Sequence, residues 1–315
     1  MRLDNALSTN SLASSQPIGF SLVVLAAGLG SRFGGNKPLA GFGPNNTTLL
    51  ELNMFNAYQA GCRHVVLIIA PNSQPIFEQQ FSQKFAADLV IEYAFQAFNN
   101  LPHHCSLSIS RHKPLGTAHA LWCCRHLIKG PFVVTNGDDY YGANALQTAQ
   151  HHFNNNNERW GIVAYNVANT LSNFGGVNRG LCSVNSEQQL TSINECYDIS
   201  LVDEQIQGQL SEQLNNPLVV LAASQLVSMN FWLLTPAIFD VLADFIQTFL
   251  STVTSSNECQ LPDVIEQSLT QRAINVYSSE SQWFGLTYPQ DKEWVKNQLN
   301  HLKNQEKSFY LHNMS

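Results

Sequence analysis

The sequence predicts an α/β fold in which a Rossmann-like, mainly parallel mixed sheet is sandwiched by helices. Continuous apolar runs without polar alternation lie at residues 21–27, 64–70 and 132–135, and such runs are typical of strands buried on both faces. Segments with the helical spacing of apolar residues separate these runs. The first run leads directly into a glycine-rich turn, at the strand end where open α/β sheets bind ligands.

The first half alternates strands and helices. The strand over 21–27 is apolar throughout, and the run HVVLIIA at 64–70 is stopped by Pro71 and Asn72. A helix over 48–60 follows from an apolar face that includes Leu49 and Leu52. The remaining elements expected here are a helix over 74–85, a strand over 88–94, a helix over 116–127 and a short strand over 132–135.

The second half is less regular and has no internal repeat. Four consecutive asparagines at 154–157 cannot pack apolar surface, so they predict a loop between the halves. The elements expected after it are strands over 161–166, 180–184, 190–193 and 227–233, a long amphipathic helix over 235–250, and a helix from Asp291 onward.

Length, composition and charge narrow the function. The chain has 315 residues, of which 44% are hydrophobic, enough for a sizeable core. Its formal net charge is −7 and it has no Lys/Arg run, which argues against nucleic acid as the partner but leaves a small phosphorylated ligand open. No run of about 18 apolar residues occurs, so no membrane-spanning helix and no membrane partner are expected.

Cysteines and histidines give no metal motif. The seven cysteines are scattered without a CxxC pair, which is typical of reduced thiols in a cytoplasmic protein. The histidines at 103–104, 119 and 151–152 lack the spacing of a metal site. The apolar run at 21–27 faintly resembles a signal-peptide core, but an acidic residue precedes it and a glycine loop continues it, so a cytoplasmic location is expected.

The strongest chemical signal is LAAGLGSRFGGNKPL at 25–39. Glycines after a buried strand let backbone N–H groups face a polyphosphate closely, while Arg32 adds a planar fork and Lys37 a mobile point charge. A dinucleotide loop is excluded because Phe33 stands at the third glycine, and a P-loop because GK[ST] is absent. A plain glycine turn with two surface cations stays open.

Two further segments point to the same sheet edge. In KPLGTAHA at 113–120, Gly116 allows close approach of a ligand and Thr117 can cap the helix that begins there. In FVVTNGDDYYG at 132–142, Asp138 directly follows a buried strand, and one or two carboxylates are what Mg²⁺ prefers. Asp139 is expected to support that site or to face solvent. Each segment alone is also compatible with an ordinary helix start or turn.

Together these segments resemble the signature motifs of the sugar-1-phosphate nucleotidyltransferase superfamily, which includes MobA-like cofactor enzymes. The resemblance extends from about residue 20 to 291. It implies a nucleotide-diphospho-sugar transferase (GT-A-like) fold and Mg²⁺-dependent transfer of a nucleoside monophosphate from a nucleoside triphosphate to a small phosphorylated acceptor, first of all a sugar 1-phosphate.

The resemblance also implies roles for single residues. By this resemblance, Asp138 is the metal ligand, and Arg32 and Lys37 stabilise the charge of the phosphates. Gly-Val at 176–177, Glu195 and the strand SMNFW at 228–232 match segments that line the acceptor site. The implied sites are therefore catalytic Arg32, Lys37 and Asp138; nucleotide-binding Leu25, Ala26, Ala27, Gly28, Gly30, Ser31, Gly116 and Thr117; and acceptor-binding Gly176, Glu195 and Asn230.

Four departures from the family pattern affect the base, the acceptor and the metal. Lys113 and Pro114 stand where glutamines often read the base, Cys196 replaces a lysine that grips the sugar phosphate, and Gly285 in WFGLT replaces an aspartate that is a second metal ligand. The interval from Arg32 to Lys37 is short, as in cofactor-type members. Two alternatives therefore stay open: a cytidylyl- or guanylyltransferase for a non-sugar acceptor such as phosphocholine, a polyol phosphate or a cofactor precursor, and a catalytically inactive nucleotide sensor.

The expected organisation is one domain after a flexible tail. Residues 1–17 are the tail, and 18–315 form a single nucleotidyltransferase domain. Within it, about 18–142 form the nucleotide-binding half, 143–290 the acceptor half, and 291–315 a C-terminal helix and tail. Homo-oligomerisation is left open by the sequence.

Overall fold

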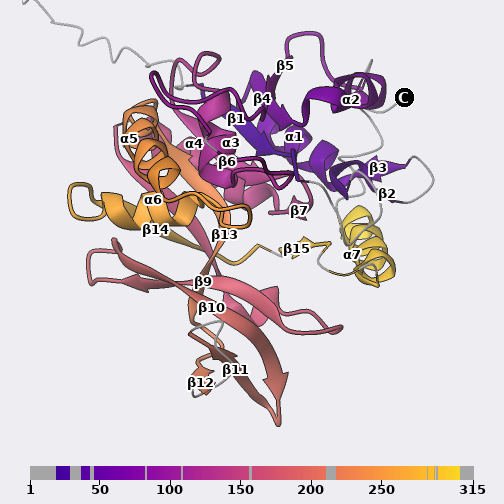
Figure 1. Cartoon of the computed structure of the whole chain (residues 1–315). Coiled ribbons are helices and arrows are strands. Elements are labelled where there is room, and N and C mark those ends of the chain that lie inside the picture. The colour runs from indigo at the N-terminus through magenta and orange to yellow at the C-terminus, as the bar shows by residue number, and fades with distance from the viewer. Residues whose placement is uncertain are drawn as a thin grey trace, which may run out of the picture.

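Four parallel strands with apolar side chains on both faces form the centre of the molecule in the computed structural model (Figure 1). They are β1 (Ser21–Leu25), β4 (His64–Ile69), β5 (Val90–Phe95) and β6 (Phe132–Asn136), in the order β5-β4-β1-β6. All four end at the same edge, which brings the loops after β1, β5 and β6 together. The structure describes residues 19–28, 37–42, 46–81, 84–107, 109–155, 158–210, 218–281, 283–286, 288 and 290–305.

Helices cover both faces of this sheet because successive strand residues point to opposite sides. Leu22 and Val24 of β1 pack into one apolar cluster, whereas Val23 packs into the other. The first cluster is covered by α1 (Leu49–Gln59), α2 (Gln74–Phe81) and α4 (Ala143–Asn155), and the second by α3 (Thr117–Cys123), α5 (Ile238–Ser251) and α6 (Leu261–Ser268).

The start of α1 is fixed by a capping box. The hydroxyl of Thr48 accepts from the backbone N–H of Glu51, and the Glu51 carboxylate accepts from the N–H of Thr48. These two bonds satisfy donors that have no partner inside the helix. The fixed helix positions Asn53, whose amide reaches the segment after β6 at the sheet edge.

Strand β13 (Leu226–Leu234) joins the two halves of the chain. Its last residues pair antiparallel with β6, while Val227 and Ser228 near its start pair with β9 (Val177–Val184). Its other edge pairs with β8 (Trp160–Asn166), which β14 (Ile274–Ser279) extends in parallel. The sheet therefore branches at β13, beside the end of β6.

The branch is an antiparallel extension that projects from the body, by which we mean the central sheet and the helices that cover it (Figure 1). Each strand pairs with its chain neighbour, so the extension is a meander. Its strands are β9 (Val177–Val184), β10 (Leu190–Val202), β11 (Gln205–Gln209) and β12 (Leu218–Leu221).

Short elements and a C-terminal helix complete the fold. Helix α7 (Asp291–Gln305) packs Val295 and Leu299 against Tyr140 and Phe284. The short elements are η1 (Lys37–Leu39), β2 (Gly41–Phe42), β3 (Thr47–Thr48), η2 (Pro71–Ser73), β7 (Asp139–Tyr140), η3 (Val167–Thr170) and β15 (Phe284–Gly285).

The predicted fold class, a mainly parallel mixed sheet between helices, is confirmed. The loop predicted at 154–157 is wrong at its start, because Asn154 and Asn155 are the last residues of α4, whose buried Leu146, Ala149 and Phe153 hold it. The predicted tail, 1–17, lies outside the described residues. Within the described residues, no helix combines the length and apolarity needed to cross a bilayer.

Candidate active site

Two cavities meet at the end of β6. Cavity 1, about 440 Å³, opens at the carboxyl ends of the parallel strands, and cavity 2, about 270 Å³, opens toward β9 and β10. Asn136 and Asp138 line both. Cavity 1 is lined by Leu25, Ala27, Gly28, Gln96, Lys113, Pro114, Gly116, Thr117, Ala120, Asn136, Asp138 and Glu258.

The loop after β1 forms one wall of cavity 1. The backbone N–H of Ala26 donates to the Ile68 carbonyl at 2.8 Å, so the loop leaves the sheet in line with its neighbour β4. Leu25, Ala27 and Gly28 line the cavity, and Gly28 is exposed, with no atom of the described residues within 4 Å of the place that a Cβ would take. Of the predicted loop residues, Gly30, Ser31 and Arg32 lie outside the described residues, as does the side chain of Lys37.

The opposite wall begins at Gly116. Its φ of +111° is a conformation that side chains rarely adopt, and a Cβ there would overlap the backbone of Cys259. The expectation that Thr117 caps its own helix is wrong. Its hydroxyl donates to Gln260 Oε1 at 3.0 Å and accepts from the N–H of Leu261 at 2.8 Å, which ties the start of α3 to the start of α6.

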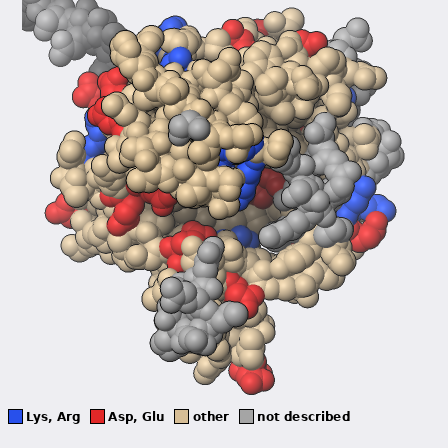
Figure 2. All heavy atoms as spheres, in the orientation of Figure 1, with Lys and Arg blue, Asp and Glu red and all other residues tan. Residues whose placement is uncertain are grey.

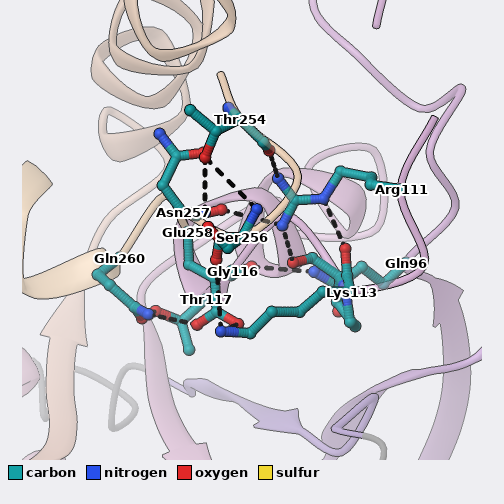
Figure 3. Close-up of polar contacts among 11 residues, drawn as sticks. Gln96, Arg111, Lys113, Gly116, Thr117, Thr254, Ser256, Asn257, Glu258 and Gln260 are labelled. Carbon is teal, nitrogen blue, oxygen red and sulfur yellow. Dashed lines mark hydrogen bonds and ion pairs between the residues drawn. The ribbon is translucent and has the colours of Figure 1, made fainter. Parts of the chain in front are cut away.

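Behind this wall, the buried side chain of Arg111 donates hydrogen bonds to several backbone carbonyls (Figure 3). Its Nε donates to the carbonyl of Lys113 at 2.7 Å, and its Nη2 donates to the carbonyls of Pro114 and Asn257 at 2.9 Å each. Its Nη1 donates to the carbonyl of Thr254 at 2.9 Å. One guanidinium thus joins two chain segments that are more than 140 residues apart in sequence.

Charged and amide side chains stand at the rim that Arg111 supports. Lys113 Nζ lies 2.9 Å from Glu258 Oε1, and both residues line cavity 1. Gln96, at the end of β5, donates from Nε2 to the carbonyl of Gly116 at 2.9 Å and also lines the cavity (Figure 3). Sequence reasoning missed Gln96 because residues 97–112 separate it from the Gly-Thr segment. Its position two residues after the strand predicted over 88–94 was the available signal.

Asp138 stands where the two cavities join. The N–H of Gly137 donates to the carbonyl of Leu25 at 3.0 Å, which docks the segment after β6 onto the end of β1. A Cβ at Gly137 would lie 3.2 Å from the Cβ atoms of both Ala26 and Pro38. Since Pro38 adjoins Lys37 in the chain, the end of the predicted cation loop lies beside Gly137, the residue that precedes Asp138.

Asp139 is buried, so of the two alternatives for this residue the one in which it faces solvent is wrong. Its Oδ2 accepts from Asn136 Nδ2 at 2.8 Å and lies 3.3 Å from the Tyr141 hydroxyl. Its backbone pairs with Gly285 across β7 and β15. A Cβ at Gly285 would overlap the Asp139 carboxylate, so a carboxylate from the facing strand occupies the space that a side chain at 285 would take.

Cavity 2 has walls made of side chains from antiparallel strands. Glu195 of β10 pairs with Gly180 of β9, and Cys196 pairs with Arg179. Burial raises the pKa of Glu195, and the nearby guanidinium of Arg179 opposes that shift. The lining is Asn136, Asp138, Asp139, Asn178, Arg179, Gly180, Glu195, Ser228, Met229, Asn230, Pro262, Trp283 and Leu286.

Asn230 sits on a β-bulge beside the cavity junction. Its φ of +59° places it in the left-handed region, and the register of β13 against β8 shifts between Ser228 and Trp232. Its Nδ2 lies 3.5 Å from Asn136 Oδ1, while its own Oδ1 accepts from Trp232 Nε1 at 3.3 Å. Bulges and strained residues of this kind are frequent at functional sites because they redirect a side chain.

The predicted acceptor residues are only partly brought together. Glu195 and Asn230 line cavity 2, whereas Gly176 is absent from the described lining of both cavities. The carbonyl of Gly176 accepts from the Tyr288 hydroxyl at 2.7 Å, and a Cβ there would overlap Asp198. Gly176 therefore supports the start of β9. The body and the extension enclose a hollow whose walls carry both basic and acidic groups (Figure 2).

The sequence matches the family model described as nucleotidyl transferase over residues 21–283. The chain belongs to this family. It is therefore a nucleotidyltransferase, as the motifs in its first half predict. No curated protein has a significantly similar sequence.

Solved nucleotidyltransferases share the fold at low sequence identity. One is the inositol-1-phosphate CTP transferase from T. maritima, with a TM-score of 0.60, 14% identity and coverage of 90% of this chain and 96% of that one. A putative glucose-1-phosphate thymidylyltransferase from Bacillus anthracis, in complex with a sucrose, has a TM-score of 0.61, 14% identity and coverage of 90% and 95%. A UDP-glucose pyrophosphorylase complexed with UDP-glucose has a TM-score of 0.59, 16% identity and coverage of 90% and 100%.

The donor set at the cavity junction of this nucleotidyltransferase fits Mg²⁺. The ion needs one or two carboxylates and takes its other ligands from phosphates and water. Asp138 offers a carboxylate to both cavities, and the Asp139 carboxylate adjoins it in cavity 2. The described part of the chain has no cluster of three or more His, Cys, Asp or Glu side chains that could hold a metal by itself. Such a site therefore depends on substrate oxygens.

Proposed function

We propose that the enzyme transfers a nucleoside monophosphate from a nucleoside triphosphate to the phosphate of a small acceptor, with a sugar 1-phosphate as the first candidate. The observation that supports this reaction is the junction of two cavities at Asn136 and Asp138. Two substrates that exchange a group need adjacent binding spaces with a shared polar boundary.

The reaction is an in-line displacement. An oxygen of the acceptor phosphate attacks the α-phosphorus, the bond from that phosphorus to the bridging oxygen breaks, and pyrophosphate leaves with the electron pair. A phosphate monoester is ionised at pH 7, so the site has to position and neutralise charge rather than remove a proton.

The roles proposed for single residues follow from this requirement. Asp138 would hold Mg²⁺, which neutralises charge on the donor and acceptor phosphates when bound. Arg32 would stabilise the charge that builds on the α-phosphate, and Lys37 would bind the outgoing phosphates. The backbone of residues 25–28, 30 and 31 would approach the triphosphate, and Gly116, Thr117 and Gln96 would face the base.

In cavity 2, the carboxylate of Glu195 would accept hydrogen bonds from hydroxyl groups of the acceptor substrate, and Asn230 would orient that substrate. We further propose a single domain over residues 18–315, with about 18–142 binding the nucleotide and 143–290 the acceptor. A reducing compartment, the cytoplasm, is consistent with seven cysteines that are all free thiols.

A second candidate is cytidylyl or guanylyl transfer to a non-sugar acceptor such as a polyol phosphate. The specific observation in its favour is Cys196, a buried thiol at the position where the family pattern has a lysine that grips the sugar phosphate. The fold is also that of a transferase whose described substrate is inositol 1-phosphate, a polyol phosphate. Both candidates share the same mechanism and differ only in the acceptor.

The experiment is a pyrophosphate-release assay on the purified full chain with Mg²⁺. Each of five nucleoside triphosphates (ATP, CTP, GTP, UTP, dTTP) is combined with glucose 1-phosphate, mannose 1-phosphate, myo-inositol 1-phosphate and phosphocholine, with product mass as a second readout. We expect release with at least one pair and a product containing both substrates. Tight triphosphate binding without release for any pair, and without release from a pool of cell metabolites, would instead support a nucleotide sensor.

A further inference from the structure

Arg179 of β9 is the single cation in the described lining of cavity 2. The other ionisable groups in that lining are the carboxylates of Asp138, Asp139 and Glu195. Across the β9–β10 pair, Arg179 faces Cys196, whose thiol is buried and whose pKa is raised by that burial. The facing position therefore supplies no positive charge, and an anion that enters cavity 2 has Arg179 as its cationic partner.

The side chain is held in place by neutral groups. Its Nη2 donates to the carbonyl of Thr170 at 2.6 Å, its Nε to the Thr170 hydroxyl at 3.3 Å, and its Nη1 to the carbonyl of Asn178 at 2.8 Å. The guanidinium carbon also lies 5.1 Å from the ring centre of Trp283. Within the described residues, no carboxylate lies within ion-pair distance, so the charge is positioned without being neutralised by direct contact.

The remaining donors suit a phosphate. A guanidinium has five N–H groups, and each terminal nitrogen carries two of them. The bonds to Asn178 and Thr170 use one N–H on each terminal nitrogen, and no bond to a described residue uses the second. One N–H on each terminal nitrogen is thus left for the oxygens of a phosphate monoester, for which a guanidinium is a suitable partner.

The surroundings sustain the positive charge. Burial lowers the pKa of Arg179, while Asp139 and Glu195 nearby oppose that shift. Arg179 and Trp283 also form the wall between cavity 2 and a third cavity of about 550 Å³ beside η3 and α7. Arg179 therefore lines the space in which an acceptor would lie, and Thr170, which binds its guanidinium, lines the third cavity.

We infer that Arg179 binds the phosphate group of the acceptor and thereby selects phosphate monoesters over neutral sugars and polyols. This inference rests on the proposed function, and it specifies which residue in the acceptor half recognises the substrate. The positive charge that position 196 lacks comes from the neighbouring strand, opposite it in the pair.

The test compares Arg179→Gln and Arg179→Lys with the control Arg159→Gln, whose side chain is exposed before β8. With any acceptor found active, Arg179→Gln should raise the acceptor KM about 10- to 100-fold, the range for losing hydrogen bonds to a charged group. The KM for the nucleoside triphosphate should stay within about twofold, as expected for a contact outside cavity 1. Arg179→Lys should lie between, because it keeps the charge and loses the fork.

Addition of Cys196→Lys to Arg179→Gln should lower the acceptor KM again, which a purely structural role of Arg179 does not predict. An unchanged acceptor KM in a folded Arg179→Gln or Arg179→Lys protein would overturn the inference and leave the transferase function intact. If the wild type releases no pyrophosphate with any pair, the proposed function fails. Calorimetric binding of inorganic phosphate then still tests Arg179, since equal affinity in wild type and Arg179→Gln would overturn its role.

Discussion

The two cavities are built in different ways. Cavity 1 lies at the ends of parallel strands, and much of its wall is backbone and small residues such as Gly28, Ala27 and Gly116. Cavity 2 lies against antiparallel strands, and its chemistry comes from side chains such as Arg179 and Glu195. A cavity wall made of backbone requires glycine at particular positions. In a wall made of side chains, the same chemical group can be supplied by either of two paired strands.

This difference explains where recognition from sequence succeeds. Few residues other than glycine can occupy position 116, because its φ is +111° and there is no room for a Cβ. Gly116 is therefore part of a motif that can be recognised in the sequence. A cation for the acceptor can be placed on β9 or on the facing position of β10 with little change of the fold. Cavity 1, the proposed nucleotide side, therefore carries the family pattern, whereas the proposed acceptor side at cavity 2 is expected to carry the specificity of this chain.

The largest effect is expected at the residue shared by both cavities. Asp138→Asn should lower kcat about 10²- to 10³-fold, since it removes a preorganised charge at the reacting phosphates. The pyrophosphate-release assay measures it, with Asp244→Asn on the exposed surface of α5 as control. Full turnover in Asp138→Asn would mean that the two cavities do not meet at the reacting atoms.

The next largest effects are expected at Arg111, behind the wall of cavity 1, where stability and the triphosphate KM should change. Arg111→Met removes four hydrogen bonds to carbonyls and should lower the free energy of unfolding by about 3 kcal/mol. Urea unfolding measures this loss, with the exposed Arg159→Met as control. The KM for the triphosphate should also rise, while the acceptor KM stays unchanged. A rise in the acceptor KM alone would reverse the assignment of the cavities.

The stability of the protein should depend on pH through His119, which lies beside Gln96 of cavity 1. Burial lowers the pKa of His119 to about 4, and its ring lies 3.5 Å from Gln96. In the unfolded chain the ring titrates near its ordinary value, so only the unfolded state gains a proton as the pH falls below that value. Stability should therefore drop by about 2 kcal/mol between pH 7 and pH 5 through this group.

The measurement is urea unfolding at the two pH values. His119→Gln should lose this part of the pH dependence, and the exposed His126→Asn should keep it. An identical pH dependence in wild type and His119→Gln would show that His119 is not held neutral beside Gln96.

The smallest effect should be confined to cavity 2. Glu195→Gln should raise the acceptor KM about fivefold to tenfold, the consequence of weakening one hydrogen bond to an acceptor hydroxyl. The triphosphate KM should not change, and Glu187→Gln in an exposed turn should behave as wild type. A changed triphosphate KM with an unchanged acceptor KM would place Glu195 outside the acceptor site.

The sequence predicts the central sheet well because its strands are buried on both faces and therefore lack polar alternation. Residues 21–25 and 64–69 are wholly apolar or nearly so, and both are strands. In contrast, β11 and β12 lie in the projecting meander, where half-exposed residues such as Gln207 and Val219 weaken the pattern. The end of α4 illustrates another limit, since the run of asparagines predicts a loop, whereas Asn155 is helical in a helix held by the buried Phe153 and Leu146.

The site is predictable only where chain neighbours form it. Asp138 follows its strand directly, so its place at the sheet edge can be predicted from the sequence. Gln96 reaches Gly116 across a segment of variable composition, and Arg179 reaches the cavity through pairing with β10, so neither contact appears as a local motif. The overlap between Gly285 and the Asp139 carboxylate likewise depends on the pairing of β7 with β15.

The most direct test of the account is a crystal structure of the enzyme with Mn²⁺ and the non-hydrolysable α,β-methylene analogue of its preferred triphosphate. The account predicts an anomalous Mn²⁺ peak within coordination distance of the Asp138 carboxylate and the α-phosphate, with the base in cavity 1 beside Gln96 and Gly116. A triphosphate bound elsewhere, or a metal peak remote from Asp138, would contradict the claim that the two cavities form one reaction site.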